Sequence, residues 1–164
     1  MVDRNFTFFP VYPSTLAAKR YDFWKLPLTG IIINEYHLPL TAPLKNPKSK
    51  TPIAVLDSGT TFISGPEADV ANFWEAVGGA SYDNAARVWR IPCTRLANVS
   101  FVLGGVDGVP SQTYSLHPAD VNWKDPDNPH LQWCLGGVQN GVVHIFRFPS
   151  SCADFTNCFV WKRF

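Results

Sequence analysis

The sequence from Ile53 to Pro66, IAVLDSGTTFISGP, places a single carboxylate, that of Asp57, between two apolar segments. The apolar run Ile53–Leu56 predicts a buried strand, and residues 62–63 predict the next one. An acidic side chain in such surroundings is costly unless hydrogen bonds compensate for its burial. The stretch therefore predicts that the residues after Asp57 donate to its carboxylate.

These following residues are suited to that role. Gly59 permits a tight turn, and backbone N–H groups together with the hydroxyls of Ser58 and Thr60 can donate to Asp57. Several donors of this kind keep a buried carboxylate ionised, which would prepare an oriented oxygen base. The alternative interpretation is an aspartate that merely opens a turn after a strand and is capped by its own backbone.

The composition indicates one globular domain. The chain has 164 residues, of which 46% are hydrophobic and 16% charged, enough for a real core and unlike a disordered segment. The formal net charge of +1 does not favour nucleic acid or an anionic membrane surface as a partner. No apolar run approaches the roughly 20 residues of a membrane helix, and the N-terminus lacks the pattern of a signal peptide.

One helix is expected among many strands. Pro66 and Glu67 suit a first helical turn, and Gly78-Gly79 suits its end. Apolar residues at helical spacing should face the core; they are Val70, Phe73, Trp74 and Val77.

The rest of the chain has strand and turn signals. Strands are expected within residues 6–12, 86–93, 98–105, 112–121 and 130–137. Residues 21–34 should form two extended pieces hinged near Gly30, and residues 35–51 a loop or irregular hairpin. The 14 prolines and 11 glycines are scattered without a period, which also favours short strands. The predicted fold class is mainly β.

The cysteines and histidines give weaker signals. Cys93, Cys134, Cys152 and Cys158 lack the CxxC pairs of a zinc site and are compatible with two disulfides. Three pairings are possible, of which we prefer Cys93 with Cys134 and Cys152 with Cys158. No histidine spacing is typical of metal or triad chemistry, so neither a metal nor a cofactor is expected; the histidines are His37, His117, His130 and His144.

Five segments in order resemble the C-terminal lobe of pepsin-like aspartic proteases. They are FFPVY with FWKLPLTGIIIN, the Asp57 motif itself, GPEADVANFWEAVGGA, WRIPCTRLANVSFVLGG, and QTYSLHPADV with CLGGVQNG. The resemblance spans roughly residues 6–140. It implies a single lobe of a two-lobed acid-protease β fold, and it places Cys93 and Cys134 where that lobe has its disulfide.

The resemblance also implies roles for individual residues. Asp57 matches the catalytic aspartate of this lobe, which shares a proton with a second aspartate across a bound water. Ser58 matches a hydroxyl that bonds across to the other lobe, while Gly59 and Thr60 match the groups that hold the carboxylate. Gly59 and Thr61 match positions that line the substrate cleft, and Phe23 matches one on the primed side. The implied substrate is a peptide or protein.

The chain departs from the family pattern at two places. It contains one Asp-Ser/Thr-Gly motif, so a missing N-terminal lobe or a second copy of the chain must complete the pair of aspartates. Residues 141–164 lack the expected hydrophobic-hydrophobic-Gly motif, which predicts a division into a lobe (1–140) and an atypical tail (141–164). A catalytically incomplete fragment and a non-enzymatic peptide- or protein-binding lobe are the alternative functions.

The cellular location expected from the resemblance is secreted, vacuolar or lysosomal. Two N-glycosylation sequons, Asn5-Phe6-Thr7 and Asn98-Val99-Ser100, agree with it.

Overall fold

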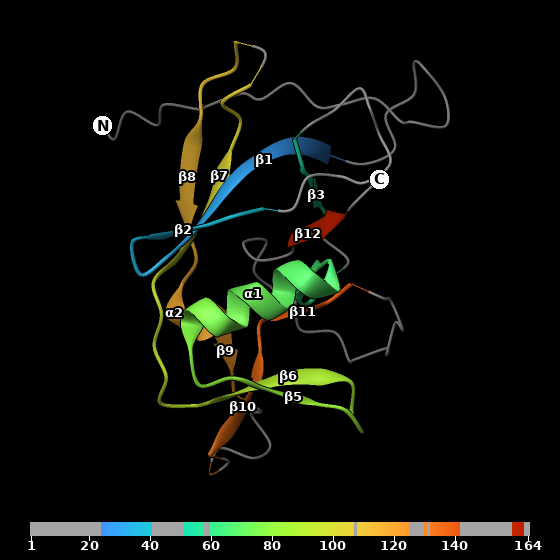
Figure 1. Ribbon diagram of the computed structural model, residues 1–164, viewed down its shortest axis with the longest axis vertical. Helices are drawn as coiled ribbons and strands as arrows, with labels where there is room; N and C mark the ends of the chain where they lie inside the picture. Colours follow the sequence, from blue (N-terminus) through green and yellow to red (C-terminus); the bar gives the residue numbers. More distant parts are fainter. Residues whose placement is uncertain are drawn as a thin grey trace, which may run out of the picture.

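The protein is mainly β in the computed structural model. The structure describes residues 24–40, 51–57, 60–106, 108–124, 130, 132–141 and the backbone of 159–162. The strand expected within residues 6–12 lies outside these ranges. The arrangement is consistent with the predicted single pepsin-like lobe: two sheets with a helix packed between them (Figure 1).

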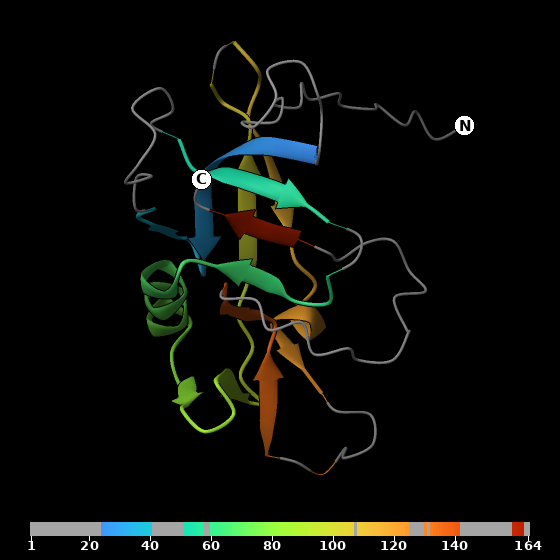
Figure 2. The same ribbon diagram turned by 90° about the vertical axis from the view of Figure 1, so that its right-hand side faces the viewer.

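The larger sheet has eight strands. Their order is β11–β4–β12–β3–β1–β7–β8, and β2 pairs with β1. Figure 2 shows β1, β3, β12 and β4 stacked in this order. The strands are β1 (Trp24–Ile33), β2 (Tyr36–Leu38), β3 (Ile53–Leu56), β4 (Ile63–Gly65), β7 (Val99–Leu103), β8 (Gln112–Ser115), β11 (Val138–Asn140) and β12 (Phe159–Lys162).

The smaller sheet has four strands in the order β5–β6–β10–β9. They are β5 (Ser81–Asp83), β6 (Val88–Pro92), β9 (Asn122–Trp123) and β10 (Trp133–Gly136). The disulfide between Cys93 and Cys134 joins the residue after β6 to β10. This bond confirms the first of the two preferred cysteine pairs; Cys152 and Cys158 lie outside the described residues.

Strand β1 belongs to two parts of the larger sheet. Its first residues, 24–27, pair with β3, and its later residues, 28–33, pair with β7. The register of the pairing with β7 shifts between Leu28 and Gly30, an irregularity of the kind that bends a strand. The hinge predicted near Gly30 corresponds to this irregularity. Asn34 and Glu35 both have positive φ and turn the chain into β2, so the predicted irregular hairpin begins here.

The predicted helix is present as α1 (Glu67–Val77) and ends at Gly78, whose φ is +79°. Its predicted apolar face is buried, and the helix contacts β1, β2 and β11. The Trp74 indole N–H donates to the Val138 carbonyl (2.9 Å). A Cβ at Gly136 would overlap the Trp74 ring. Helix and sheets therefore meet at close range around Trp74.

The strand expected over residues 112–121 is wrong in its second half. Strand β8 ends at Ser115, and Pro118–Val121 forms the short helix α2. Proline occupies its first turn, and Nδ1 of His117 accepts from the Ala119 N–H (3.2 Å). Because proline favours a first helical turn and His117 caps the N–H that follows, this segment turns instead of extending.

Strand β12 comes from the predicted tail. It pairs antiparallel with β3 and parallel with β4, and it therefore lies between them. The division into a lobe (1–140) and a tail (141–164) stays a prediction, but the last described residues of the tail belong to the larger sheet.

Candidate active site

Asp57 follows the last residue of β3. The hydroxyl of Thr60 donates to Asp57 Oδ2 (2.9 Å), and the Thr60 N–H donates to the Asp57 carbonyl (3.4 Å). The second bond ties the Thr60 backbone to that of Asp57, and the first fixes one carboxylate oxygen against Thr60. Thr60 therefore orients the Asp57 carboxylate through its hydroxyl.

Asp57 is half-buried, whereas the sequence predicted a buried carboxylate. Within β3, Ala54 and Val55 are buried, while Leu56 and Asp57 are both half-exposed. The reason is positional, because burial falls toward the end of the strand and the carboxylate lies just beyond that end. Partial exposure lowers the desolvation cost of the charge.

The residues beside Asp57 come from both ends of the chain. Leu56 lies opposite Trp24 on β1 and opposite Phe159 on β12. Trp24 is 66% exposed. Val160 of β12 lies opposite Val55 of β3 and Ser64 of β4. Strand β12 thus joins the two strands from which the Asp57 loop emerges.

The structure describes only some of the predicted site residues. Thr60 is half-buried beside Asp57, and Thr61 is exposed. Ser58, Gly59 and Phe23 lie outside the described residues. Phe62, which was not among the predicted site residues, packs edge-on against Trp123 with ring centroids 6.3 Å apart.

Sequence reasoning also missed β12. Phe159-Val160-Trp161 is a short run of strong strand formers, and this was the available signal. Three residues cannot specify which strands they pair with, so the position beside Asp57 was not predictable from them.

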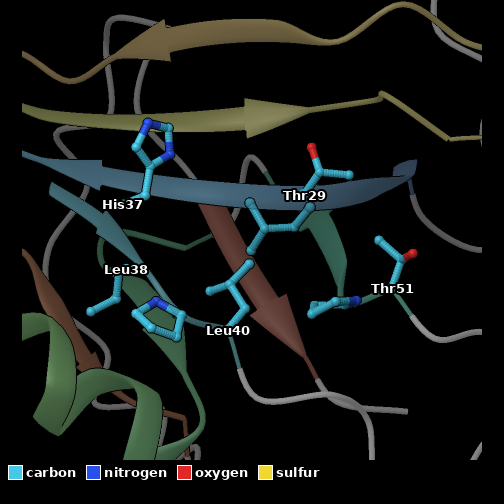
Figure 3. A pocket seen from close by; sticks show the side chains of 8 residues that line it. Thr29, His37, Leu38, Leu40 and Thr51 are labelled. Atoms are coloured by element: carbon cyan, nitrogen blue, oxygen red, sulfur yellow. The ribbon is translucent and has the colours of Figure 1, made fainter. Parts of the chain in front are cut away.

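A cavity of about 400 Å³ lies at the opposite end of β3 (Figure 3). Pro52 lies on its wall, and Asp57 is five residues further along, roughly 16 Å in an extended strand. The cavity is therefore separate from the carboxylate. Its lining is formed by Leu28, Thr29, His37, Leu38, Pro39, Leu40, Thr51 and Pro52.

Comparison with known proteins agrees with this geometry. The model of the family described as eukaryotic aspartyl protease matches residues 5–146. The chain belongs to this family. The matched range includes Asp57, its loop and both cysteines of the disulfide.

Two curated relatives are similar over shorter ranges. Cathepsin E of Rattus norvegicus is 23% identical over 124 residues, which is 76% of this chain and 27% of the relative. Embryonic pepsinogen of Gallus gallus is 25% identical over 97 residues, 57% of this chain and 23% of the relative. The matched segments thus span about a quarter of the length of these relatives.

Two further observations concern the described residues. Within these ranges, no helix is long and apolar enough to cross a membrane. The same ranges contain no group of three or more His, Cys, Asp or Glu side chains that could hold a metal ion.

Proposed function

We propose that this chain is the catalytic half-site of an aspartic-type endopeptidase and that Asp57 is its reacting carboxylate. The observation that carries the proposal is the Asp57 loop: a half-buried carboxylate at the end of β3, with one oxygen fixed by the Thr60 hydroxyl. Membership of the aspartyl protease family supports the same chemistry.

The proposed reaction needs two carboxylates. One takes a proton from a bound water, which attacks the carbonyl carbon of the scissile peptide, while the other donates a proton toward the carbonyl oxygen. The water oxygen forms the new bond to carbon, the C–N bond breaks, and the amine leaves with a proton. The chain carries one Asp-Ser/Thr-Gly motif. A missing lobe or a second copy must therefore supply the other carboxylate.

The neighbouring residues have proposed supporting roles. Thr60 and Gly59 hold the Asp57 carboxylate, and Ser58 provides the hydroxyl that bonds toward the second lobe. Gly59 and Thr61 line the cleft for an extended peptide, and the exposure of Thr61 agrees with this role. Phe23 is proposed to line the primed side of the cleft. It precedes Trp24 in the chain, and Trp24 is exposed and pairs with Leu56 beside the loop.

The protein is proposed to be secreted or to lie in a vacuole or lysosome. The Cys93–Cys134 disulfide supports this location, because disulfides of this kind persist in oxidising compartments.

The test is hydrolysis of an unfolded protein at about pH 3–4, where a pair of carboxylates can share a proton. The full chain is compared with Asp57→Asn and with the matched control Asp83→Asn, which changes a carboxylate on β5 in the smaller sheet. Cleavage that is lost only in Asp57→Asn supports the proposal and shows that a second copy completes the site.

Two other outcomes are informative. Cleavage that persists in Asp57→Asn overturns the role of Asp57. A folded chain that does not cleave but binds peptide equally well before and after Asp57→Asn favours the non-enzymatic binding lobe. This alternative is supported by the single aspartate motif.

A further inference from the structure

We propose that Asn98 is a site of N-linked glycosylation. Asn98-Val99-Ser100 fits the acceptor pattern. In the reaction, the side-chain amide nitrogen of Asn98 forms a bond to C1 of the first sugar of a lipid-pyrophosphate-linked oligosaccharide. The bond from C1 to the pyrophosphate oxygen breaks, the pyrophosphate leaves with the electron pair, and the amide nitrogen loses one proton. No oxidant or reductant is needed.

The fold presents Asn98 in a way that accommodates a glycan. Its neighbours Ala97 and Val99 are 3% and 1% exposed, whereas Asn98 is an exposed residue. This alternation places the Asn98 side chain on the opposite side from the two core residues. A sugar on Asn98 would therefore extend into solvent without disturbing the packing of its neighbours.

The backbone at Asn98 is fixed while its side chain is exposed. The Asn98 N–H donates to Asn34 Oδ1 (2.9 Å), and the Asn34 N–H donates to the Asn98 carbonyl (2.9 Å). Both bonds use backbone groups of Asn98. Attachment of a sugar at its amide nitrogen would thus leave the connection to the β1–β2 turn intact.

An exposed apolar side chain lies next to this site. Leu96, two residues before Asn98, is 70% exposed. The first sugar of a glycan has C–H groups on its ring faces, which can cover part of an exposed leucine. The serine of the sequon is also near the surface, with its hydroxyl 3.0 Å from that of Ser115.

The site lies far from the proposed catalytic carboxylate. Val99 lies opposite Ile33 at one end of β1, whereas Leu56, the residue before Asp57, lies opposite Trp24 at the other end. Nine residue steps separate these two ends, at most roughly 30 Å along the strand, which has an irregularity between Leu28 and Gly30. A glycan at Asn98 is therefore compatible with an accessible Asp57.

The proposal rests on the secretory compartment proposed above but not on catalysis by Asp57. It is tested by producing the full chain behind a secretion signal in insect cells, with Asn5→Gln as the common background to remove the other sequon. Secreted and cell-associated chains are treated with peptide N-glycosidase F and analysed by intact mass and peptide mapping. Failure of glycosylation leaves the hydrolysis assay unaffected, so the two proposals fail separately.

We expect the enzyme to lower the mass and to convert Asn98 to aspartate. Asn98→Gln and Ser100→Ala should abolish the shift, whereas Ser100→Thr should keep it, because threonine also provides the hydroxyl of the sequon. A chain without a mass shift in either pool overturns the proposal, and so does a shift that persists in Asn98→Gln. Glycans are added as the chain enters the compartment, so a variant that folds poorly still gives an answer.

Discussion

The smaller sheet and the sheet region around Asp57 are stabilised in different ways. Around the smaller sheet, side-chain amides form hydrogen bonds with backbone groups. The Gln139 amide accepts from the Trp89 N–H and donates to the Trp89 carbonyl. The Asn122 amide donates to the carbonyls of Cys93 and Arg95. A disulfide adds a covalent connection. At Asp57, the two strands that bear the loop are joined through β12, which lies about a hundred residues further along the chain.

The smaller sheet and the Asp57 loop therefore depend on different parts of the chain. The smaller sheet is held by contacts among residues 77–140, so it depends on one continuous part of the chain. The Asp57 loop depends on a strand that must return from the end of the chain. Non-local pairing carries a larger entropic cost of closure. We therefore expect the region that carries the carboxylate to be the more easily perturbed of the two.

The largest expected effect is loss of the disulfide. Cys93 and Cys134 are 41 residues apart in sequence, and Cys134 is buried. Breaking this loop should lower the free energy of unfolding by about 4 kcal/mol. Urea unfolding of Cys134→Ser measures the loss. The double variant Cys93→Ser/Cys134→Ser should lose little more stability than either single variant, since the same disulfide is absent from all three. A loss of unfolding free energy below about 1 kcal/mol in Cys134→Ser would contradict the expectation.

The second prediction concerns β12. Val160→Pro removes a backbone N–H from a strand with partners on both sides, and one unsatisfied buried group costs about 1–3 kcal/mol. Amide hydrogen exchange should show faster exchange in β3 and β4 and unchanged exchange in α1. Val160→Thr keeps the N–H and the branched side chain and serves as the control. If α1 lost as much protection as β3 and β4, the effect of Val160→Pro would not be confined to the strands beside Asp57.

The third prediction concerns the bond to Asp57. Thr60→Val removes the hydroxyl that donates to Oδ2 at nearly constant shape, and the expected loss of stability is about 1 kcal/mol. Thr60→Ser retains a hydroxyl and should recover most of the loss in urea unfolding. If Thr60→Ser and Thr60→Val are equally destabilised, the methyl group and not the hydrogen bond is responsible.

The smallest effect is expected at Asp83 in the smaller sheet. The Ala86 N–H, followed by the Arg90 side chain, lowers the pKa of Asp83 below its ordinary value of 3.8. The charged form is therefore favoured in the folded protein. This contribution is present above pH 3.8 and is lost as the pH falls through the lower folded-state pKa.

The comparison of melting temperatures tests this sign. Asp83→Asn should melt slightly below the unmodified chain at about pH 6, and the difference should shrink toward about pH 2. A difference that stays constant over this range would mean that the charge of Asp83 contributes nothing to stability.

Local patterns predicted most of the elements. The spacing of Val70, Phe73, Trp74 and Val77 predicted the buried face of α1, because a helical period is visible in four residues. Alternating segments predicted β6 and β7, strand and turn signals predicted β10, and the apolar run predicted β3. Family resemblance and the preferred pairing predicted the disulfide.

What the sequence did not predict depends on long-range placement. The half-burial of Asp57 follows from its position beyond the end of β3, and the location of β12 follows from pairing with two distant strands. Neither has a local pattern. Helix α2 was missed for another reason, because proline-led turns and strand ends share the same residue types.

The central structural claim is that β12 pairs in register with β3, the strand that ends beside Asp57. Disulfide trapping tests it most directly, in a background with Cys152→Ser and Cys158→Ser. Residues directly opposite each other in an antiparallel pair lie on one face of the sheet, whereas a shift by one residue puts them on opposite faces. Two opposite pairs and one shifted pair therefore distinguish the register.

The opposite pairs are Ala54→Cys with Trp161→Cys and Val55→Cys with Val160→Cys. The shifted pair is Ala54→Cys with Val160→Cys. Non-reducing peptide mapping after mild oxidation should show a crosslink in at least one opposite pair and none in the shifted pair. If the shifted pair forms a crosslink as readily as the opposite pairs, or if no pair does, β12 does not hold the Asp57 loop as described.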